Sequence, residues 1–378
     1  MVKPEEPAGA VIRPTTGASG FVTGIVLAVD GELSSYSIGL EENDSMPPSR
    51  HTFGLCMYGI QYLTGSRNPN PLTIEQFTDL ADEKGLSTLE LPLHYMSPSM
   101  DRAELRNYAA RVRDRGMTIV LAGPNLARTD DVAGQLELAA ATGTKVFRCV
   151  MSPLLEGNRG PVGGYDGWQR HLDSIITTLK ALAPRAEALD IRIGVENHQD
   201  ADSADLIRVC ERVGSPNVGV TLDAGNPLAV GEDPVEFAKR ILPHLVDVHL
   251  KDYRMILTDE GYRLVHCAIG DGVVDFAALW PLFDSKPDVP RSIEMAALSE
   301  RHVRLLTDEW WAGQAARDVR TIIPVLRTMR ERGEPDGDPR DWQTPIEHGD
   351  LSRAVEWETE RLEKSVENLA RIEREAGQ

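Results

Sequence analysis

The chain has 378 residues, and its 40 basic and 59 acidic side chains give a formal net charge of −19. This charge repels polyanions, which argues against nucleic acids and anionic membranes as partners. An apolar fraction of 41% over this length is enough to bury a large core. The four cysteines show no CxxC pair and no zinc-type spacing, so we expect buried thiols in a reducing compartment: Cys56, Cys149, Cys210 and Cys267.

Residues 1–50 are expected to form an N-terminal arm. They mix proline and glycine with one apolar run, Phe21–Val29, which predicts an edge strand or hairpin. That run is far shorter than the roughly 20 residues that cross a bilayer. The first residues, Met1–Glu6, lack the basic and apolar regions of a secretion signal, so we expect a cytoplasmic protein.

Residues 51–331 alternate short apolar runs with longer amphipathic stretches, the pattern of repeated βα units around a parallel sheet. Eight strands are expected at Phe53–Met57, Leu86–Leu91, Thr118–Ala122, Lys145–Val150, Ile191–Glu196, Val218–Asp223, Leu245–Leu250 and Ser292–Met295. Eight helices are expected at about 73–84, 101–115, 130–142, 166–189, 202–213, 234–241, 275–284 and 301–331. This predicts an α/β fold, a (β/α)₈ TIM barrel.

Two local patterns support this assignment. Thr73 and Gln76 form a capping-box pattern at the first helix, which should end at Gly85. A doubly wound dinucleotide-binding sheet would need a GxGxxG turn after an early strand, and none is present. Gly270–Gly272 occurs late in the chain and predicts a tight turn. A hairpin is expected over Tyr253–Cys267.

Residues 332–378 are expected to form a linker, Pro335–Pro339, followed by a charged amphipathic helix from about 350 to 377. Its apolar residues recur at spacings near three, four and seven: Leu351, Val355, Leu362, Val366, Leu369 and Ile372. Such a stripe buries one face, against either its own barrel or another subunit.

Four potential metal ligands stand near the carboxyl ends of successive predicted strands, where barrel active sites form. They are Glu196, Asp223, His249 and Glu294. The first two intervals, 27 and 26 residues, equal about one βα repeat, so neighbouring strands should bring the side chains together. Three carboxylates and one imidazole suit one hard or borderline divalent cation, with Mn²⁺ preferred and Mg²⁺, Co²⁺ or Zn²⁺ as alternatives.

The sequence resembles the xylose-isomerase-like superfamily of sugar phosphate isomerases and epimerases, including inosose dehydratase-like and carbon-glycoside-cleaving members. The matching phrases are Glu196-Asn197-His198, Leu222-Asp223-Ala224-Gly225-Asn226, His249-Leu250-Lys251-Asp252, Gly270-Asp271-Gly272-Val273-Val274-Asp275-Phe276 and Ile293-Glu294. The resemblance covers roughly residues 52 to 300. It implies that the cation binds a carbonyl and a neighbouring hydroxyl and stabilises an enediolate, while Glu196 and Glu294 remove and return the proton.

Further residues near the strand ends are candidates for catalysis or substrate contact. His198 could act as a general base or bind a hydroxyl, or could be an ordinary loop histidine. Lys251 could stabilise an oxyanion, or could pair with Asp252. Substrate contacts are expected from Asn226, Arg254, Glu90 and His94, with Arg148 as a further candidate. Asn226 replaces the histidine of some ketose epimerases, which favours dehydratase or lyase chemistry.

The resemblance therefore implies an isomerase, epimerase or lyase acting on a sugar or keto-sugar. The alternatives within this chemistry are a β-eliminating lyase on 3-keto-glycosides and an inosose-type dehydratase. Outside it, an apurinic-endonuclease-like phosphodiesterase would need three zinc ions and more histidines, and a non-catalytic barrel would not need the ligand set. The expected partners are a small-molecule substrate and either further copies of the chain or a small second subunit.

Overall fold

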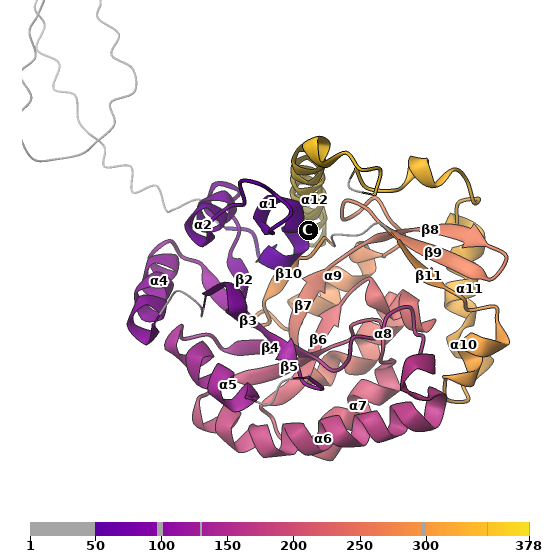
Figure 1. The fold of residues 1–378 in the computed structure, drawn as a ribbon, viewed down its shortest axis with the longest axis horizontal. Coiled ribbons are helices and arrows are strands. Elements are labelled where there is room, and N and C mark those ends of the chain that lie inside the picture. The colour runs from indigo at the N-terminus through magenta and orange to yellow at the C-terminus, as the bar shows by residue number, and fades with distance from the viewer. Residues whose placement is uncertain (1–49, 97–100, 129–130, 296–299, 346, 378) are drawn as a thin grey trace, which may run out of the picture. The chain divides into compact units, whose positions relative to one another are not determined.

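The computed structural model describes residues 50–96, 101–128, 131–295, 300–345 and 347–377. The expected Phe21–Val29 strand lies outside these residues. In the described part, eight strands close into one parallel barrel (Figure 1). They are β1 (Gly54–Cys56), β2 (Thr88–Pro92), β3 (Thr118–Asn125), β4 (Val146–Val150), β5 (Arg192–Glu196), β6 (Val218–Asp223), β7 (Leu245–Leu250) and β10 (Arg291–Ile293). The predicted TIM barrel is confirmed.

Helices follow the strands and form the outer layer of the barrel (Figure 1). The longer ones are α2 (Ile74–Glu83), α4 (Arg102–Asp114), α5 (Val132–Ala141), α6 (Gly164–Ala188), α7 (Ser203–Val213), α8 (Pro234–Ile241) and α9 (Phe276–Asp284), and the short ones are α1 (Gln61–Thr64) and α3 (Leu93–Met96). The predicted capping box of Thr73 and Gln76 begins α2. Apolar faces of these helices pack onto strands whose residues are buried on both sides, as a parallel sheet requires.

A three-stranded antiparallel sheet is added to the barrel, with two of its strands between β7 and α9 and the third after β10. The expected hairpin is confirmed as β8 (Tyr253–Thr258) and β9 (Gly261–His266). The expectation of one long helix over 301–331 was wrong, because β11 (Glu300–Val303) pairs with β9, followed by α10 (Asp308–Ala312) and α11 (Ile323–Arg332). Buried Val303 and Leu305 flank exposed Arg304, which is the alternation of an extended chain and does not fit a helical face.

The C-terminal helix, α12 (Ala354–Ala376), packs against α1 and α9 and so lies in the outer layer of the barrel. Leu362, Leu369 and Ile372 belong to the main hydrophobic core. At its two ends, Glu358 accepts a hydrogen bond from the Leu63 amide at 2.7 Å, and Glu373 accepts one from the Thr52 amide at 2.7 Å. The apolar stripe of this helix is therefore buried against its own barrel.

Within the described part of the chain, no helix has the length and apolar character needed to cross a membrane.

Candidate metal centre

Four side chains converge at the carboxyl end of the barrel. Glu196 ends β5, Asp223 ends β6, His249 lies near the end of β7, and Glu294 directly follows β10. These strands are neighbours in the barrel, and Asp223 pairs with His249 in the β6–β7 register. Each residue offers one ligand atom such that all four atoms lie within 4.8 Å of one another. All four side chains are buried, so the arrangement can enclose a single ion.

The turn after β6 fixes the Asp223 carboxylate. Its Oδ1 accepts hydrogen bonds from the amides of Gly225 at 3.1 Å and Asn226 at 3.3 Å. The Asn197 side chain bonds both main-chain groups of Asp223, at 2.6 and 3.0 Å. Gly225 is required here because a Cβ would lie 2.6 Å from the Tyr253 ring. The Asp-Ala-Gly-Asn motif thus holds one carboxylate oxygen and leaves Oδ2 facing the cluster.

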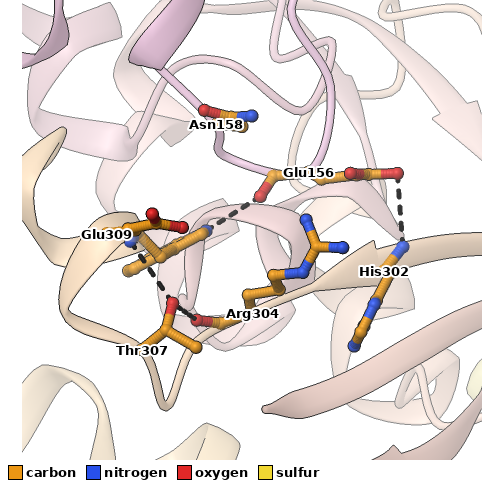
Figure 2. Close-up of a pocket in the computed structure, with 7 residues that line it drawn as sticks. Glu156, Asn158, His302, Arg304, Thr307 and Glu309 are labelled. Carbon is orange, nitrogen blue, oxygen red and sulfur yellow. Dashed lines mark hydrogen bonds between the residues drawn. The ribbon is translucent and has the colours of Figure 1, made fainter.

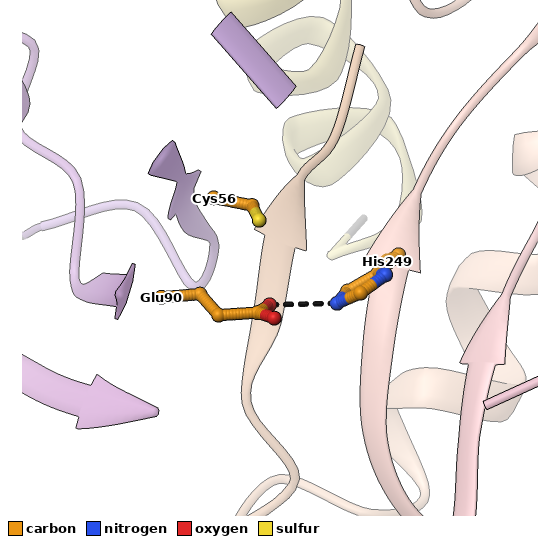
Figure 3. A group of neighbouring side chains, drawn as sticks. All are labelled: Cys56, Glu90 and His249. Carbon is orange, nitrogen blue, oxygen red and sulfur yellow. Dashed lines mark hydrogen bonds and ion pairs between the residues drawn. The ribbon is translucent and has the colours of Figure 1, made fainter. Parts of the chain in front are cut away.

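His249 is held between two carboxylates. Its Nδ1 lies 2.7 Å from Oε2 of Glu294 and 4.0 Å from Oε1 of Glu196. Its Nε2 lies 2.6 Å from Oε2 of Glu90 (Figure 3), and the other oxygen of Glu90 accepts a hydrogen bond from Nε of Arg148 at 3.1 Å. We assign the proton to Nε2, because a metal-binding histidine commonly donates its other N–H to a carboxylate. That tautomer leaves the lone pair of Nδ1 available to a cation.

Cys56 on β1 lies beside Glu90 and His249, and ligand atoms of these three also lie within 4.8 Å of one another (Figure 3). Burial, reinforced by the charge of Glu90, raises the pKa of the Cys56 thiol well above its ordinary value. A thiol that stays protonated is a poor metal ligand, because the thiolate is the binding form. Glu90 and His249 already bond to each other. The group of Cys56, Glu90 and His249 therefore supports the four-residue cluster and is not a second metal site.

Two cations balance part of the buried negative charge. Lys251 Nζ contacts Asp223 Oδ2 and lies 3.1 Å from Oε2 of Glu294. Arg148 Nη1 lies 3.2 Å from Oε2 of Glu196. Burial raises the pKa of Asp223 to about 6, against the lowering effect of Lys251. Burial also raises the pKa of Glu196, although the Arg148 guanidinium opposes it.

The unpartnered atoms of the cluster test whether a cation fits. Oε1 of Glu196 is buried without a hydrogen-bond partner among the described residues, and Nδ1 of His249 faces Oε2 of Glu294 at 2.7 Å without the geometry of a hydrogen bond. Such atoms are rare in folded proteins, because buried polar groups nearly always have a partner. A divalent cation bound here would give both atoms a partner, and the oxygen-rich set suits a hard or borderline ion. The residues present therefore fit a metal.

Comparison with known proteins assigns the chain to a family. Residues 78–317 match the family described as the xylose isomerase-like TIM barrel. This chain belongs to that family. A curated relative, 3-oxo-isoapionate decarboxylase of Pectobacterium atrosepticum, is 24% identical over 267 residues, which cover 70% of this chain and 88% of the relative.

Solved structures of low identity share the fold of this xylose isomerase-like barrel. D-psicose 3-epimerase from Clostridium cellulolyticum H10, in a structure with D-tagatose, is 12% identical with a TM-score of 0.51, covering 75% of this chain and 99% of that one. The probable 3-DHS dehydratase AsbF from Bacillus anthracis is 14% identical with a TM-score of 0.50, covering 74% and 99%. The alignments cover 99% of each of these two chains and about three quarters of the present one, so both proteins are shorter than the present chain.

Three of the residues expected to assist the xylose isomerase-like chemistry lie at the cluster. Lys251 contacts the carboxylates of Asp223 and Glu294 in the cluster, and no ion pair with Asp252 is formed among the described residues. His198 has a buried Nδ1 without a partner among the described residues, and burial lowers the pKa of its imidazole to about 4, which keeps it neutral. Asn226 accepts hydrogen bonds at Oδ1 from Tyr253 at 2.8 Å and Gln199 at 3.2 Å.

The other expected substrate contacts are placed differently. Glu90 is fully buried and holds His249 and Arg148, so the structure gives it a supporting position beneath the ligands. Arg254 forms an ion pair with Glu334 and, as the strand neighbour of Tyr253, faces the opposite side of β8. His94 is exposed on α3, where its ring lies at 44° to the ring of Tyr95, with 4.7 Å between the ring centroids.

Sequence reasoning missed two residues near the cluster, Tyr253 and Gln199. The strand alternation of the expected hairpin could have placed Tyr253, because it follows the Lys-Asp pair directly. Gln199 gives no such signal, because its role depends on a backbone φ of 67°. Glu156 has a φ of 63°, and its amide donates to the Gln199 side chain at 3.2 Å. Positive φ values at non-glycine residues store strain that surrounding contacts must hold.

Asp252 holds the glycine-containing turn that precedes α9. Its carboxylate accepts hydrogen bonds from the amides of Gly270 and Gly272, both at 2.9 Å, and of Val274 at 3.0 Å. A Cβ at Gly272 would lie 2.2 Å from that carboxylate. The expected tight turn is therefore present, and it anchors the added sheet to the barrel mouth.

A separate pocket lies between the loop after β4 and the segment from β11 to α10 (Figure 2). Its lining residues are Glu156, Asn158, His302, Arg304, Thr307, Glu309 and Trp310. Trp310 Nε1 donates to the Glu156 carbonyl at 2.8 Å, and the His302 amide donates to the Glu156 carboxylate at 3.3 Å. These bonds hold Glu156 in its strained backbone conformation. Glu156 also connects this pocket to Gln199, because its main-chain N–H donates to the Gln199 side chain.

Proposed function

We propose that this chain is a divalent-metal-dependent enzyme that removes a proton next to the carbonyl group of a sugar or keto-sugar, acting as an isomerase, epimerase or lyase. The convergence of Glu196, Asp223, His249 and Glu294 on one buried point carries this proposal. Family membership supports it, because the chain matches the xylose isomerase-like barrel over residues 78–317.

The same four side chains would hold the ion. Manganese is the preferred cation, with Mg²⁺, Co²⁺ and Zn²⁺ as alternatives, because three carboxylates and one imidazole suit hard or borderline ions. When bound, a divalent cation supplies Lewis-acid polarisation of the substrate carbonyl, which acidifies the neighbouring C–H bond. Glu90 would orient His249 through the hydrogen bond at Nε2.

The two glutamates would move the proton. Burial raises the pKa of Glu196, which brings the carboxylate closer to the range of an effective general base. Burial acts in the same direction on Glu294, but Lys251 and His249 outweigh it and hold its pKa well below the ordinary value. Return of the proton to the opposite face of the same carbon gives epimerisation, return to the neighbouring carbon gives isomerisation, and departure of a β-substituent gives elimination. Lys251 would donate hydrogen bonds to the oxygen that gains negative charge.

The curated relative supports the same class of chemistry. Its name describes decarboxylation of a 3-oxo acid. When a 3-oxo acid loses carbon dioxide, the electron pair of the broken bond becomes an enolate beside the carbonyl. A site that stabilises negative charge next to a carbonyl serves proton removal, elimination and decarboxylation alike, so the reaction class proposed here accommodates this relative.

A phosphodiesterase or scaffold role has less support. The net charge of −19 opposes nucleic acid, and the four-residue cluster contains a single histidine, His249. We further propose a small-molecule substrate and a cytoplasmic location. Assembly with copies of itself or with a small second subunit stays a prediction, which light scattering of the purified protein and of the protein from its native host would test.

The test of the metal site is elemental analysis of three purified proteins after chelation and reloading with Mn²⁺. Wild type should hold about one ion per chain. Asp223→Asn should hold none, because Oδ2 no longer carries charge. Asp166→Asn removes an exposed carboxylate on α6 and should match wild type. Equal metal content in Asp223→Asn and wild type would refute the site.

The test of the reaction is proton exchange in D₂O, followed by NMR, with the manganese-loaded protein and a panel of ketoses and 3-keto-glycosides. Deuterium at a carbon next to the carbonyl indicates epimerisation or isomerisation. Deuterium with loss of a β-substituent indicates elimination. Exchange at no substrate carbon with any member of the panel, in a protein that does bind metal, would remove the support for proton abstraction.

A further inference from the structure

His266, at the end of β9, is a buried histidine whose ring nitrogens lack hydrogen bonds to the described residues. Its residue is 5% exposed, and neither Nδ1 nor Nε2 has a hydrogen-bond partner among the described residues. A buried imidazole normally bonds through at least one nitrogen, because desolvation of an unpaired N–H or nitrogen lone pair is unfavourable. Its ring instead packs against Tyr253, with 4.6 Å between the ring centroids.

The position of His266 relates it to the metal-ligand cluster. Tyr253 and His266 are directly paired across β8 and β9, so their side chains share one face of the hairpin. On that face the Tyr253 hydroxyl donates to Asn226 Oδ1 at 2.8 Å, and the main-chain N–H of Asn226 in turn donates to Asp223 Oδ1. His266 therefore lies on the side of the added sheet that covers the barrel mouth.

The surroundings of His266 keep its ring neutral. Burial lowers the pKa of His266 well below the ordinary value, and the positive charges of Lys251, Arg301 and Arg361 act in the same direction against Glu294. Arg361 on α12 donates to the main-chain carbonyl of His266 at 2.6 Å, which fixes the backbone there. A neutral imidazole offers one N–H donor and one nitrogen acceptor. A hydroxyl group, itself a donor and an acceptor, matches both.

Two further polar atoms near the cluster are buried without partners in the described part of the chain, namely Nδ1 of His198 and Nδ2 of Asn226. They come from the loops after β5 and β6, whereas His266 comes from the added sheet. We propose that His266 is a substrate-binding residue that hydrogen-bonds a neutral hydroxyl group of the sugar, opposite the side chains of the barrel strands. This inference rests on the proposed function and adds to it a residue that binds a substrate hydroxyl.

The first test measures thermal stability of the manganese-loaded, sugar-free protein. His266→Phe keeps a ring against Tyr253 and removes both unpartnered nitrogens, so Tm should rise by about 2 °C. His302→Phe, on the neighbouring strand β11, loses the contact of His302 with the Thr258 hydroxyl at 3.1 Å and should not gain stability. A fall of Tm in His266→Phe would overturn the proposal, because the imidazole would then stabilise the fold.

The second test measures binding of D-tagatose and D-fructose to the same loaded proteins by NMR titration. His266→Phe should weaken binding at least tenfold, and His266→Gln should recover part of it, because an amide also donates and accepts. Affinities that do not differ between wild type and His266→Phe would overturn the proposal. The metal content of every variant is measured in parallel. Absence of metal from the wild type would refute the proposed function instead, whereas full metal content with unchanged sugar binding would refute only the role of His266.

Discussion

A buried carboxylate on the C-terminal helix predicts a specific dependence of stability on pH. Glu358 is 2% exposed and accepts a hydrogen bond from the Leu63 amide at 2.7 Å. Burial raises its pKa from the ordinary value of 4.5 to about 8. That difference corresponds to on the order of 5 kcal/mol, as an upper limit, between the two protonation states.

The sign follows from proton binding. Between pH 4.5 and about 8 the folded state keeps the proton that the unfolded state releases, so stability falls as pH rises through this window. Glu358→Gln removes this titration while it keeps an oxygen that can accept from Leu63. The variant should therefore match wild type near pH 4.5 and exceed it in Tm by an increasing margin up to about pH 8.

The assay is thermal unfolding by circular dichroism across this pH range, with Glu360→Gln as the control because Glu360 is exposed on the same helix. The control should follow the wild-type curve at every pH. The reasoning would be refuted by parallel Tm curves for Glu358→Gln and wild type, because these would mean that Glu358 titrates alike in the folded and unfolded protein.

Two further predictions concern the metal centre and the docking of α12. Glu90→Gln should weaken Mn²⁺ binding about 10–100-fold, because residue 90 no longer accepts a charge-assisted hydrogen bond from His249 Nε2, now at 2.6 Å. Titration with Mn²⁺ measures the affinity. An unchanged affinity would argue that Glu90 does not orient His249. Leu369→Ala should lower the free energy of unfolding by about 2–4 kcal/mol in urea, because Leu369 is fully buried in the main core, whereas Leu306→Ala, at a position 57% exposed, should change it by less than about 0.5 kcal/mol.

The fold could be predicted because its signals are local. Apolar runs of strand length recur between amphipathic helices, and the ends of those strands carry Glu196, Asp223 and His249 one βα repeat apart. Parallel strands in a closed barrel bring all their carboxyl ends to one face, so spacing alone suffices to expect convergence. The capping box at Thr73 and the hairpin after Asp252 were predictable for the same reason, since both depend on residues close in sequence.

The segment from residue 300 onwards was harder to predict because its structure depends on distant partners. The strand β11 exists through pairing with β9, although its residues lie beside a stretch that reads as helical. The apolar stripe of α12 indicated in the sequence that one face of this helix is buried. Only the tertiary structure shows that α1 and α9 cover that face.

The sequence by itself determined which residue types meet at the barrel mouth, because a βα repeat sets where each strand ends. Only the tertiary structure decided which contacts each residue makes. Glu90 bonds to His249, Arg254 pairs with Glu334, and His266 packs against Tyr253 in a separate sheet. These outcomes depend on burial and on contacts between residues far apart in the chain. A periodic pattern of apolar residues indicates which face of a helix or strand is buried. It does not indicate which residues elsewhere in the chain contact that face.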